Sequence, residues 1–133
     1  MRKYQNYTIL NAKATTGAGT AILVEDYRHL VLWFATDGGG TAALTVKFQI
    51  SNAIEEPNWE SAQSVTNEWD YVDVVPYMSK SATIYYGDDG IAVATADDYL
   101  YAQVNTDGVK WLNAIVTART AGSVTVKAKI YSD

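Results

Sequence analysis

Apolar and polar residues alternate along much of the chain, with the period of two that is typical of strands with one buried and one wet face. From Thr41 to Ser51 the apolar residues recur at every second position, and Ala43 is the only exception. Ser123 to Tyr131 and Trp111 to Arg119 alternate in the same way. The pattern predicts three long amphipathic strands. In the Trp111 strand, the residues expected to point inward are Leu112, Ala114, Val116 and Ala118.

The apolar run from Leu30 to Ala35 does not alternate, which favours a core strand in the middle of a sheet, covered on both faces. Asp37-Gly38-Gly39-Gly40 follows it and carries turn residues, so we expect a hairpin to the strand near Thr41. Thr120-Ala121-Gly122 likewise predicts a C-terminal hairpin. Asn52 to Glu68 has no strand character and predicts one long loop.

Six shorter strands are expected between these elements, at Tyr7–Ala12, Ala21–Val24, Asp70–Val75, Ala82–Tyr86, Ile91–Thr95 and Leu100–Asn105. Turn residues separate them at Thr16–Gly19, Gly87–Gly90 and Thr106–Gly108. Eight or nine strands without a helix predict an all-β fold, an antiparallel β-sandwich of about eight strands forming a single domain over residues 1–133. Jelly-roll connections are one form of that sandwich, and a closed barrel is the alternative.

The amino-acid composition and the net charge exclude several classes of function. The 133 residues are 48% hydrophobic, enough for one core, and the absence of cysteine excludes disulfides and thiolate sites. No apolar run is long enough to span a membrane, and we expect no cleaved secretion signal, because polar residues interrupt the N-terminal segment. A net charge of −5 argues against nucleic acid or an anionic membrane as the partner.

The charge is unevenly distributed along the chain. Between Glu55 and Asp98 there are ten acidic residues and one basic residue, Lys80. After Asp107 the balance reverses, with four basic residues (Lys110, Arg119, Lys127 and Lys129) and one acidic residue (Asp133). The basic C-terminal strands are therefore expected either to face the acidic segment, within one molecule or between neighbours, or to form a separate solvated face.

Candidate catalytic chemistry is sparse. His29 is the only histidine, no Gly-x-Ser-x-Gly motif accompanies it, and one histidine without cysteine is a poor zinc set. The acidic pairs Glu55-Glu56, Asp88-Asp89 and Asp97-Asp98 are more typical of turns than of a glycosidase. Calcium in an acidic loop such as 87–90 stays open as an alternative. We expect no catalytic residue, no metal site and no cofactor.

The aromatic residues favour binding. Ten tyrosines and four tryptophans stand against two phenylalanines, a bias toward the rings enriched at interfaces. The residues that we expect to bind a partner are Trp59, Trp69, Tyr85, Tyr86, Tyr99 and Tyr101. Replacing Trp59 and Trp69 by alanine is then expected to weaken assembly without unfolding the domain. In the alternative, Trp33 belongs to the core and the tyrosines form cross-strand pairs.

Three stretches together have a recognisable pattern. They are Gly17–Ala21 running into Tyr27–Leu32, Thr45–Ser51 leading to Asn58-Trp59, and Gly108–Leu112 followed by Arg119–Val126. In this order they resemble small β-sandwich proteins of tailed bacteriophage virions. They cover most of the chain in order. The chain departs from the pattern at Asn52–Pro57, where an Asp-Gly turn would be expected. The resemblance implies a structural role in a capsid or tail.

The sequence thus predicts a non-enzymatic structural or accessory protein of a virion, made in the bacterial host cytoplasm and acting as a capsid decoration, head-fibre or tail-associated protein. Its partners would be other virion subunits, and unprotected sheet edges favour a homo-oligomer, with a trimer preferred. The alternative is a carbohydrate-binding or receptor-binding module in which two or three aromatic rings stack on a glycan.

Overall fold

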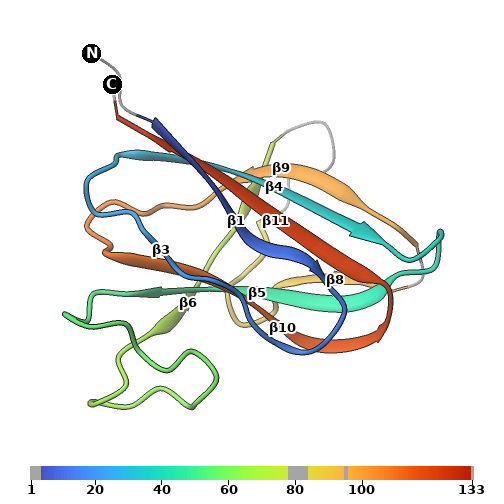
Figure 1. Cartoon of the computed structure of the whole chain (residues 1–133), viewed down its shortest axis with the longest axis horizontal. Helices are drawn as coiled ribbons and strands as arrows, with labels where there is room; N and C mark the ends of the chain where they lie inside the picture. The colour runs from blue at the N-terminus through green and yellow to red at the C-terminus, as the bar shows by residue number, and fades with distance from the viewer. Residues whose placement is uncertain (1–3, 78–83, 95, 133) are drawn as a thin grey trace.

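The chain forms two antiparallel β-sheets packed face to face, in a computed structural model that describes residues 4–77, 84–94 and 96–132 (Figure 1). The five-stranded sheet has the order β1 (Tyr4–Lys13), β11 (Ser123–Tyr131), β4 (His29–Asp37), β9 (Tyr99–Gln103), β7 (Val75–Pro76). The predicted antiparallel β-sandwich is therefore confirmed. None of the described residues belongs to a helix that could span a membrane.

The six-stranded sheet is built on two long central strands, β5 (Ala43–Ser51) and β10 (Trp111–Ala121). Each carries two short strands on its outer edge. Along β10 these are β2 (Gly17–Ala18) and β3 (Ile22–Leu23), and along β5 they are β6 (Asp70–Val72) and β8 (Ile91–Val93). Short, interrupted edge strands of this kind offer little backbone for pairing with other chains.

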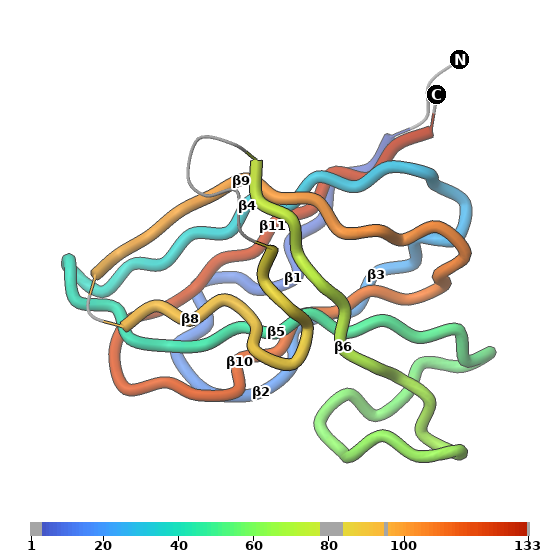
Figure 2. The backbone as a smooth tube through the Cα atoms, turned by 180° about the vertical axis from the view of Figure 1, so that it is seen from behind, coloured from blue at the N-terminus to red at the C-terminus, as the bar shows by residue number. Residues whose placement is uncertain are grey.

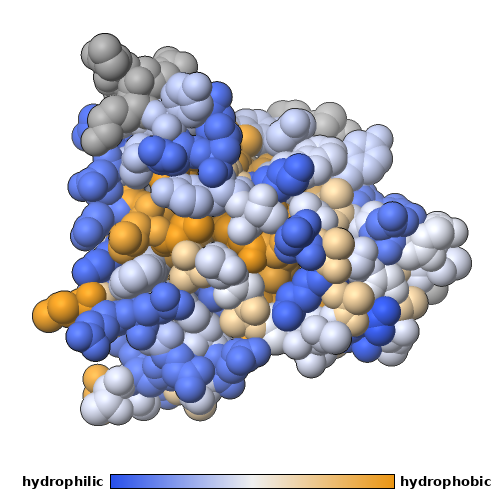
Figure 3. Space-filling model, viewed as in Figure 1, coloured by the Kyte–Doolittle hydropathy of each residue, from blue (hydrophilic) through white to orange (hydrophobic). Residues whose placement is uncertain are grey.

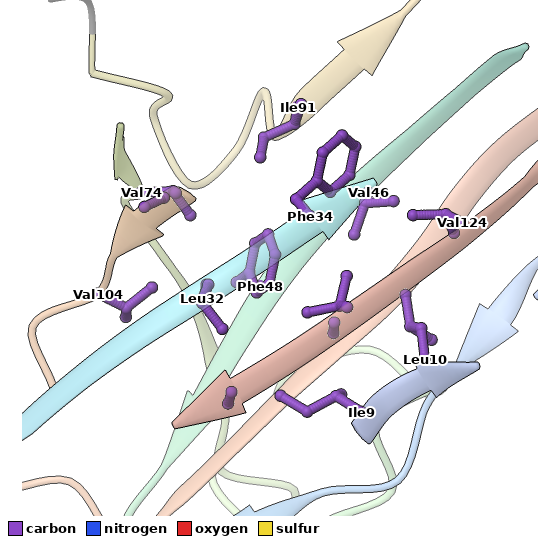
Figure 4. Close-up of a cluster of buried hydrophobic side chains, with 14 of the residues drawn as sticks. Ile9, Leu10, Leu32, Phe34, Val46, Phe48, Val74, Ile91, Val104 and Val124 are labelled. Carbon is purple, nitrogen blue, oxygen red and sulfur yellow. The ribbon is translucent and has the colours of Figure 1, made fainter. Parts of the chain in front are cut away.

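The alternating residues of the long strands form the core between the sheets. Leu32 and Phe34 of β4 meet Val46 and Phe48 of β5 in this layer (Figure 4), and each is at most 1% exposed. Every second residue of β11 joins them, at Val124, Val126, Ala128 and Ile130. The alternation read from the sequence therefore identifies the buried face of each long strand, because a period of two places every second side chain on the same side.

Both predicted hairpins are wrong. β4 and β5 belong to different sheets, as do β10 and β11, so each of these connections crosses from one sheet to the other. Gly122 has a φ of +85°, and a Cβ placed on it would lie 3.1 Å from the Asp37 carbonyl oxygen and 3.0 Å from the Ala42 Cβ. The two crossings therefore pack against each other. Alternation and turn residues are the same for a hairpin and a crossing, so they cannot distinguish the two.

Smaller differences concern the ends of the strands. Gly17-Ala18, predicted as part of a turn, pairs with β10 instead. Ala118, predicted to point inward, is exposed, because the register shifts between Val116 and Ala118. The expected Asp70–Val75 strand is divided between β6 and β7. Of the expected 82–86 strand, residues 82 and 83 lie outside the described residues, and Tyr85 forms a single bridge with Val74. The expected 91–95 strand is observed as β8, and its last residue, 95, also lies outside the described residues.

The outer sides of the two sheets differ in what covers them. The loop of residues 52–69 lies along the six-stranded sheet (Figure 2), where the side-chain amide of Gln49 donates a 2.9 Å hydrogen bond to the Trp59 carbonyl. Glu60 of the same loop accepts a 3.0 Å hydrogen bond from the backbone N–H of Ala18. Gln49 and Asn113 point to the outer side of this sheet and are nevertheless fully buried.

β4 lies in the middle of its sheet, as predicted, but it is not fully covered on both faces. Leu30, Leu32 and Phe34 are buried, while Val31 and Trp33 on the other side are only half-buried. The apolar run thus marks a strand with one side in the core and an apolar, partly open outer side.

A substitution at Gly90 tests how tightly the turn before β8 packs against β5. Its φ is +68°, and an added Cβ would lie 2.4 Å from the carbonyl oxygen of Val46. We expect Gly90→Ala to lower the free energy of unfolding by about 2 kcal/mol or more, measured by urea denaturation, because both the backbone strain and a clash oppose it. Gly108→Ala is the matched control, since Gly108 also has a positive φ (+78°) but has open space around it. Equal losses in the two variants would show that the contact with Val46 contributes nothing.

Candidate functional site

The outer side of the five-stranded sheet carries a surface of aromatic and basic residues that no other element covers among the described residues. Cross-strand register places Lys127 beside Trp33 and Trp33 beside Tyr101, so that three adjacent strands contribute one row. The next row contains Lys129 and Val31. We call this surface the aromatic face and define it by Val31, Trp33, Tyr99, Tyr101, Lys127, Lys129 and Tyr131.

Ring contacts hold the centre of the aromatic face. Trp33 lies between two tyrosines of β9, with ring centroids 4.7 Å from Tyr101 and 5.8 Å from Tyr99. Both tyrosines are 57% exposed. At the end of β11, Tyr131 stacks on His29 with centroids 4.9 Å apart. The rings are thus fixed by one another while much of their area stays in contact with water, which is typical of aromatic anchors at binding surfaces.

A hollow of about 690 Å³ opens on the aromatic face. Trp33, Val31 and Tyr101 form its apolar part, and Lys127 and Lys129 lie beside them. Asn6 and Thr8 of β1 supply polar groups at its edge. None of the described lining residues is acidic. The hollow is therefore locally basic and aromatic in a protein whose net charge is −5.

Four acidic residues lie at the edge of the other layer. They are Asp70 of β6, Asp73 after it, and Asp88 and Asp89 of the turn before β8, and we call them the acidic side. Burial, followed by the charges of Asp88 and Asp70, raises the pKa of the Tyr71 hydroxyl above its ordinary value. The Lys47 ammonium lies 4.9 Å from the Tyr71 ring centre. The acidic side thus belongs to the edge of the six-stranded sheet.

The two charged surfaces do not face each other within one molecule. Lys127 and Lys129 point away from the six-stranded sheet, because their neighbours Val126, Ala128 and Ile130 occupy the interior. For these two lysines and the acidic side, a contact between neighbouring molecules and separate solvated faces remain of the alternatives that the sequence left open.

An apolar seam separates the two sheets on one side of the sandwich. On the face viewed in Figure 3, apolar side chains form a band across the middle, with hydrophilic ones above and below. β1 and β3 are the sheet edges on this side (Figure 1). Leu23 of β3 is 46% exposed and Tyr7 of β1 is 37% exposed. Ring contacts and lysines around a hollow are established for the aromatic face, so we place the candidate site there.

The structure separates the six aromatic residues that the sequence singled out. Tyr99 and Tyr101 lie on the aromatic face. Tyr86 is 61% exposed beside the acidic side, and Tyr85 is half-buried in its bridge with Val74. Trp59 and Trp69 are 5% and 8% exposed, so neither indole is presented to a partner. We therefore no longer expect these two tryptophans to act as contact anchors.

Both tryptophans instead hold the long loop together. The Trp59 indole N–H donates a 2.8 Å hydrogen bond to the Glu56 carboxylate, and the Trp69 indole N–H donates a 3.0 Å hydrogen bond to the Ser61 carbonyl. Asn67 bonds the backbone of the same loop, including the Asn58 N–H and carbonyl. An indole with a satisfied N–H and a buried body is a packing residue.

Sequence reasoning missed Trp33, Lys127, Lys129 and Tyr131 as members of the site. The sequence offers Trp33 only as a core residue in the alternative interpretation, and it treats the two lysines as part of a basic surface without linking them to the aromatic residues. The available signal was that Val31, Trp33 and Ala35 occupy the positions between the core residues of β4. An apolar outer row on a central strand indicates a surface that something contacts.

One member of each of two acidic pairs, Asp97 and Glu56, accepts hydrogen bonds from other parts of the chain. Asp97 accepts hydrogen bonds of 2.8 Å from the N–H of Gly40, 2.8 Å from that of Gly38 and 3.3 Å from that of Ala42, and so holds the crossing between β4 and β5. Glu56 bonds Trp59, as described above. Among the described residues, no group of three or more His, Asp or Glu side chains is arranged to hold a metal ion.

The hydrogen bonds of Asp97 predict that the stability of the fold depends on pH. The N–H of Gly40, followed by those of Gly38 and Ala42, holds the pKa of the Asp97 carboxyl below its ordinary value, against a smaller opposing effect of desolvation. A depressed folded-state pKa contributes stability that is present above the unfolded-state pKa and is lost as the pH falls through the folded-state pKa. We expect Asp97→Asn to lower the Tm at neutral pH, and the difference from the unmutated chain to shrink at acid pH.

Thermal denaturation at a series of pH values checks this prediction. Asp107→Asn is the control, because it removes the same charge without touching the crossing. A Tm difference for Asp97→Asn that stays constant from neutral to acid pH would contradict the role of the ionised carboxylate.

The chain was compared with known proteins by sequence and by fold. No protein-family model matches it, and no curated protein sequence matches it. Its fold is similar to the crystal structure of SPBc2 prophage-derived protein YomS, with a TM-score of 0.67, 15% identity, and coverage of 99% of this chain and 96% of YomS. It is also similar to the crystal structure of PBSX exported protein XepA, with a TM-score of 0.70 and 19% identity. The match covers 98% of this chain and 38% of XepA.

Proposed function

We propose that this chain is a non-enzymatic structural or accessory protein of a tailed-bacteriophage particle, and that it binds other protein subunits through the aromatic face. The observation that carries the proposal is the aromatic face itself, with its half-open Trp33 between two exposed tyrosines. Trp and Tyr are enriched at interface centres, and the lysines beside them can orient a partner through charge complementarity.

The likeness in fold to SPBc2 prophage-derived protein YomS supports the phage part of the proposal. This similarity extends over nearly the whole of both chains. A capsid-decoration, head-fibre or tail-associated position would each suit a small, rigid subunit that is repeated as a homo-oligomer. Its place of action would then be the virion.

Purified phage particles test this function. We expect quantitative mass spectrometry to find the chain in particles in several copies, and Lys127→Glu/Lys129→Glu to reduce its incorporation, because the variant reverses the charge of the aromatic face. The control Lys110→Glu/Arg119→Glu changes the net charge equally at Lys110, just before β10, and at Arg119 of β10, and it should be incorporated normally. Particles that lack the chain, in cells that contain it in folded form, would contradict the proposal.

A carbohydrate-binding module is the second candidate, favoured by the hollow of about 690 Å³ beside exposed Tyr101. Sugar rings stack on flat aromatic surfaces, and Asn6, Thr8 and the two lysines offer hydrogen bonds at the edge. Saturable binding on a glycan array that disappears in Tyr101→Ala would favour this function over the first. An array on which no glycan binds would rule out the carbohydrate-binding function.

A further inference from the structure

The aromatic face has a complement on the same molecule. It is basic, with Lys127 and Lys129 beside the rings, and the described residues that line its hollow include no acid. The acidic side presents Asp70, Asp73, Asp88 and Asp89 with exposed Tyr86 next to them. Surfaces of opposite charge attract each other and fix the orientation of a contact.

Geometry prevents these surfaces from meeting within one chain. The lysines lie on the outer side of the five-stranded sheet, whereas the acidic side lies at the β5 edge of the six-stranded sheet. The two surfaces are free to meet only between molecules. Such a contact is head-to-tail, because different patches of the two copies touch, and repeating it builds a ring when the rotation closes.

We propose that the acidic side of a second copy of this chain docks on the aromatic face, and that the copies assemble head to tail. This inference names one partner for the surface invoked in the proposed function, and so rests on that function. The carboxylates of Asp88 and Asp89 pair with Lys127 and Lys129, while Tyr86 packs near Trp33 and Tyr101.

The size of the molecule suits this arrangement. A standard interface buries about 800 Å² on each partner. That is about one tenth of the 7379 Å² surface of the described chain, so each copy has room for one contact at the aromatic face and another at the acidic side.

Light scattering on a size-exclusion column measures the assembly across micromolar concentrations. We expect a multimer that dissociates when salt rises from about 0.1 M to about 1 M, because the Debye length falls from about 10 Å to about 3 Å. Lys127→Glu/Lys129→Glu and, separately, Asp88→Lys/Asp89→Lys should each raise the dissociation constant by about 100-fold, since like charges then meet.

The decisive variant combines all four substitutions in one chain. It exchanges the charges of Lys127 and Lys129 with those of Asp88 and Asp89, so self-association should return if these residues pair with each other. The control Lys110→Glu/Arg119→Glu should associate normally. Circular dichroism and thermal denaturation confirm that each variant is folded.

Three results would overturn the proposal: a monomer at every concentration of the unmutated chain, unchanged association in either double variant, or no recovery in the combined variant. None of them decides the proposed function, because particle association is measured on particles and does not need self-association. A chain that enters particles but stays monomeric alone would keep that function and reject this inference.

Discussion

Trp59→Ala is expected to lower the free energy of unfolding by about 3 kcal/mol, because it removes a large side chain that is only 5% exposed and leaves a cavity under the long loop. The substitution also leaves the Glu56 carboxylate without its indole partner. Urea denaturation followed by tryptophan fluorescence and circular dichroism measures the change.

Ile54→Ala is the matched control for this prediction. Ile54 lies in the same loop and is 87% exposed, so its loss should change the free energy of unfolding by less than about 0.5 kcal/mol. Equal stability of Trp59→Ala and Ile54→Ala would contradict the packing role of Trp59 and would return this residue to the candidate contact surface.

Tyr101→Ala should have the largest single effect on partner binding. The ring is 57% exposed at the centre of the aromatic face and is held by Trp33 at 4.7 Å. Truncation of such an anchor costs about 2 kcal/mol of binding, which is about a 30-fold rise in the dissociation constant. The domain itself should lose only about 1 kcal/mol, through the lost ring contact.

Sedimentation equilibrium of the self-assembled protein measures the binding change, and thermal denaturation measures the folding change. Val65→Ala is the control, because Val65 is fully exposed in the long loop away from the aromatic face. If Tyr101→Ala associates as tightly as Val65→Ala, the aromatic face does not carry the contact.

The local structure of the sandwich was predictable because its physical causes are local. Alternation over 41–51 and 123–131 predicts which side of each strand is buried, since every second side chain lies on the same face. The partners of each strand were not predictable in the same way. The residues at 37–40 and 120–122 allow either a hairpin or a crossing, and only packing against the opposite sheet selects the crossing.

The candidate site was predicted less well for a related reason. Alternation identifies an outward residue but does not show what covers it. Gln49 and Trp33 both point outward, yet Gln49 is fully buried under the long loop, whereas Trp33 is half-open on the aromatic face. The loop that causes this difference is distant in sequence from part of the sheet that it contacts, including Ala18 of β2, whose N–H donates to Glu60. The covering of a sheet is therefore a property of the whole fold.

The central claim is that the aromatic face is the contact surface. The chemical reactivity of the lysine side chains tests this claim most directly. Lysines of the assembled and dissociated protein are labelled with an amine-reactive reagent and quantified by mass spectrometry. The account predicts that Lys127 and Lys129 become several-fold less reactive on assembly, while Lys110, just before β10 and outside both proposed contact surfaces, keeps its reactivity. Equal reactivity of Lys127 and Lys129 in the assembled and dissociated protein would contradict it.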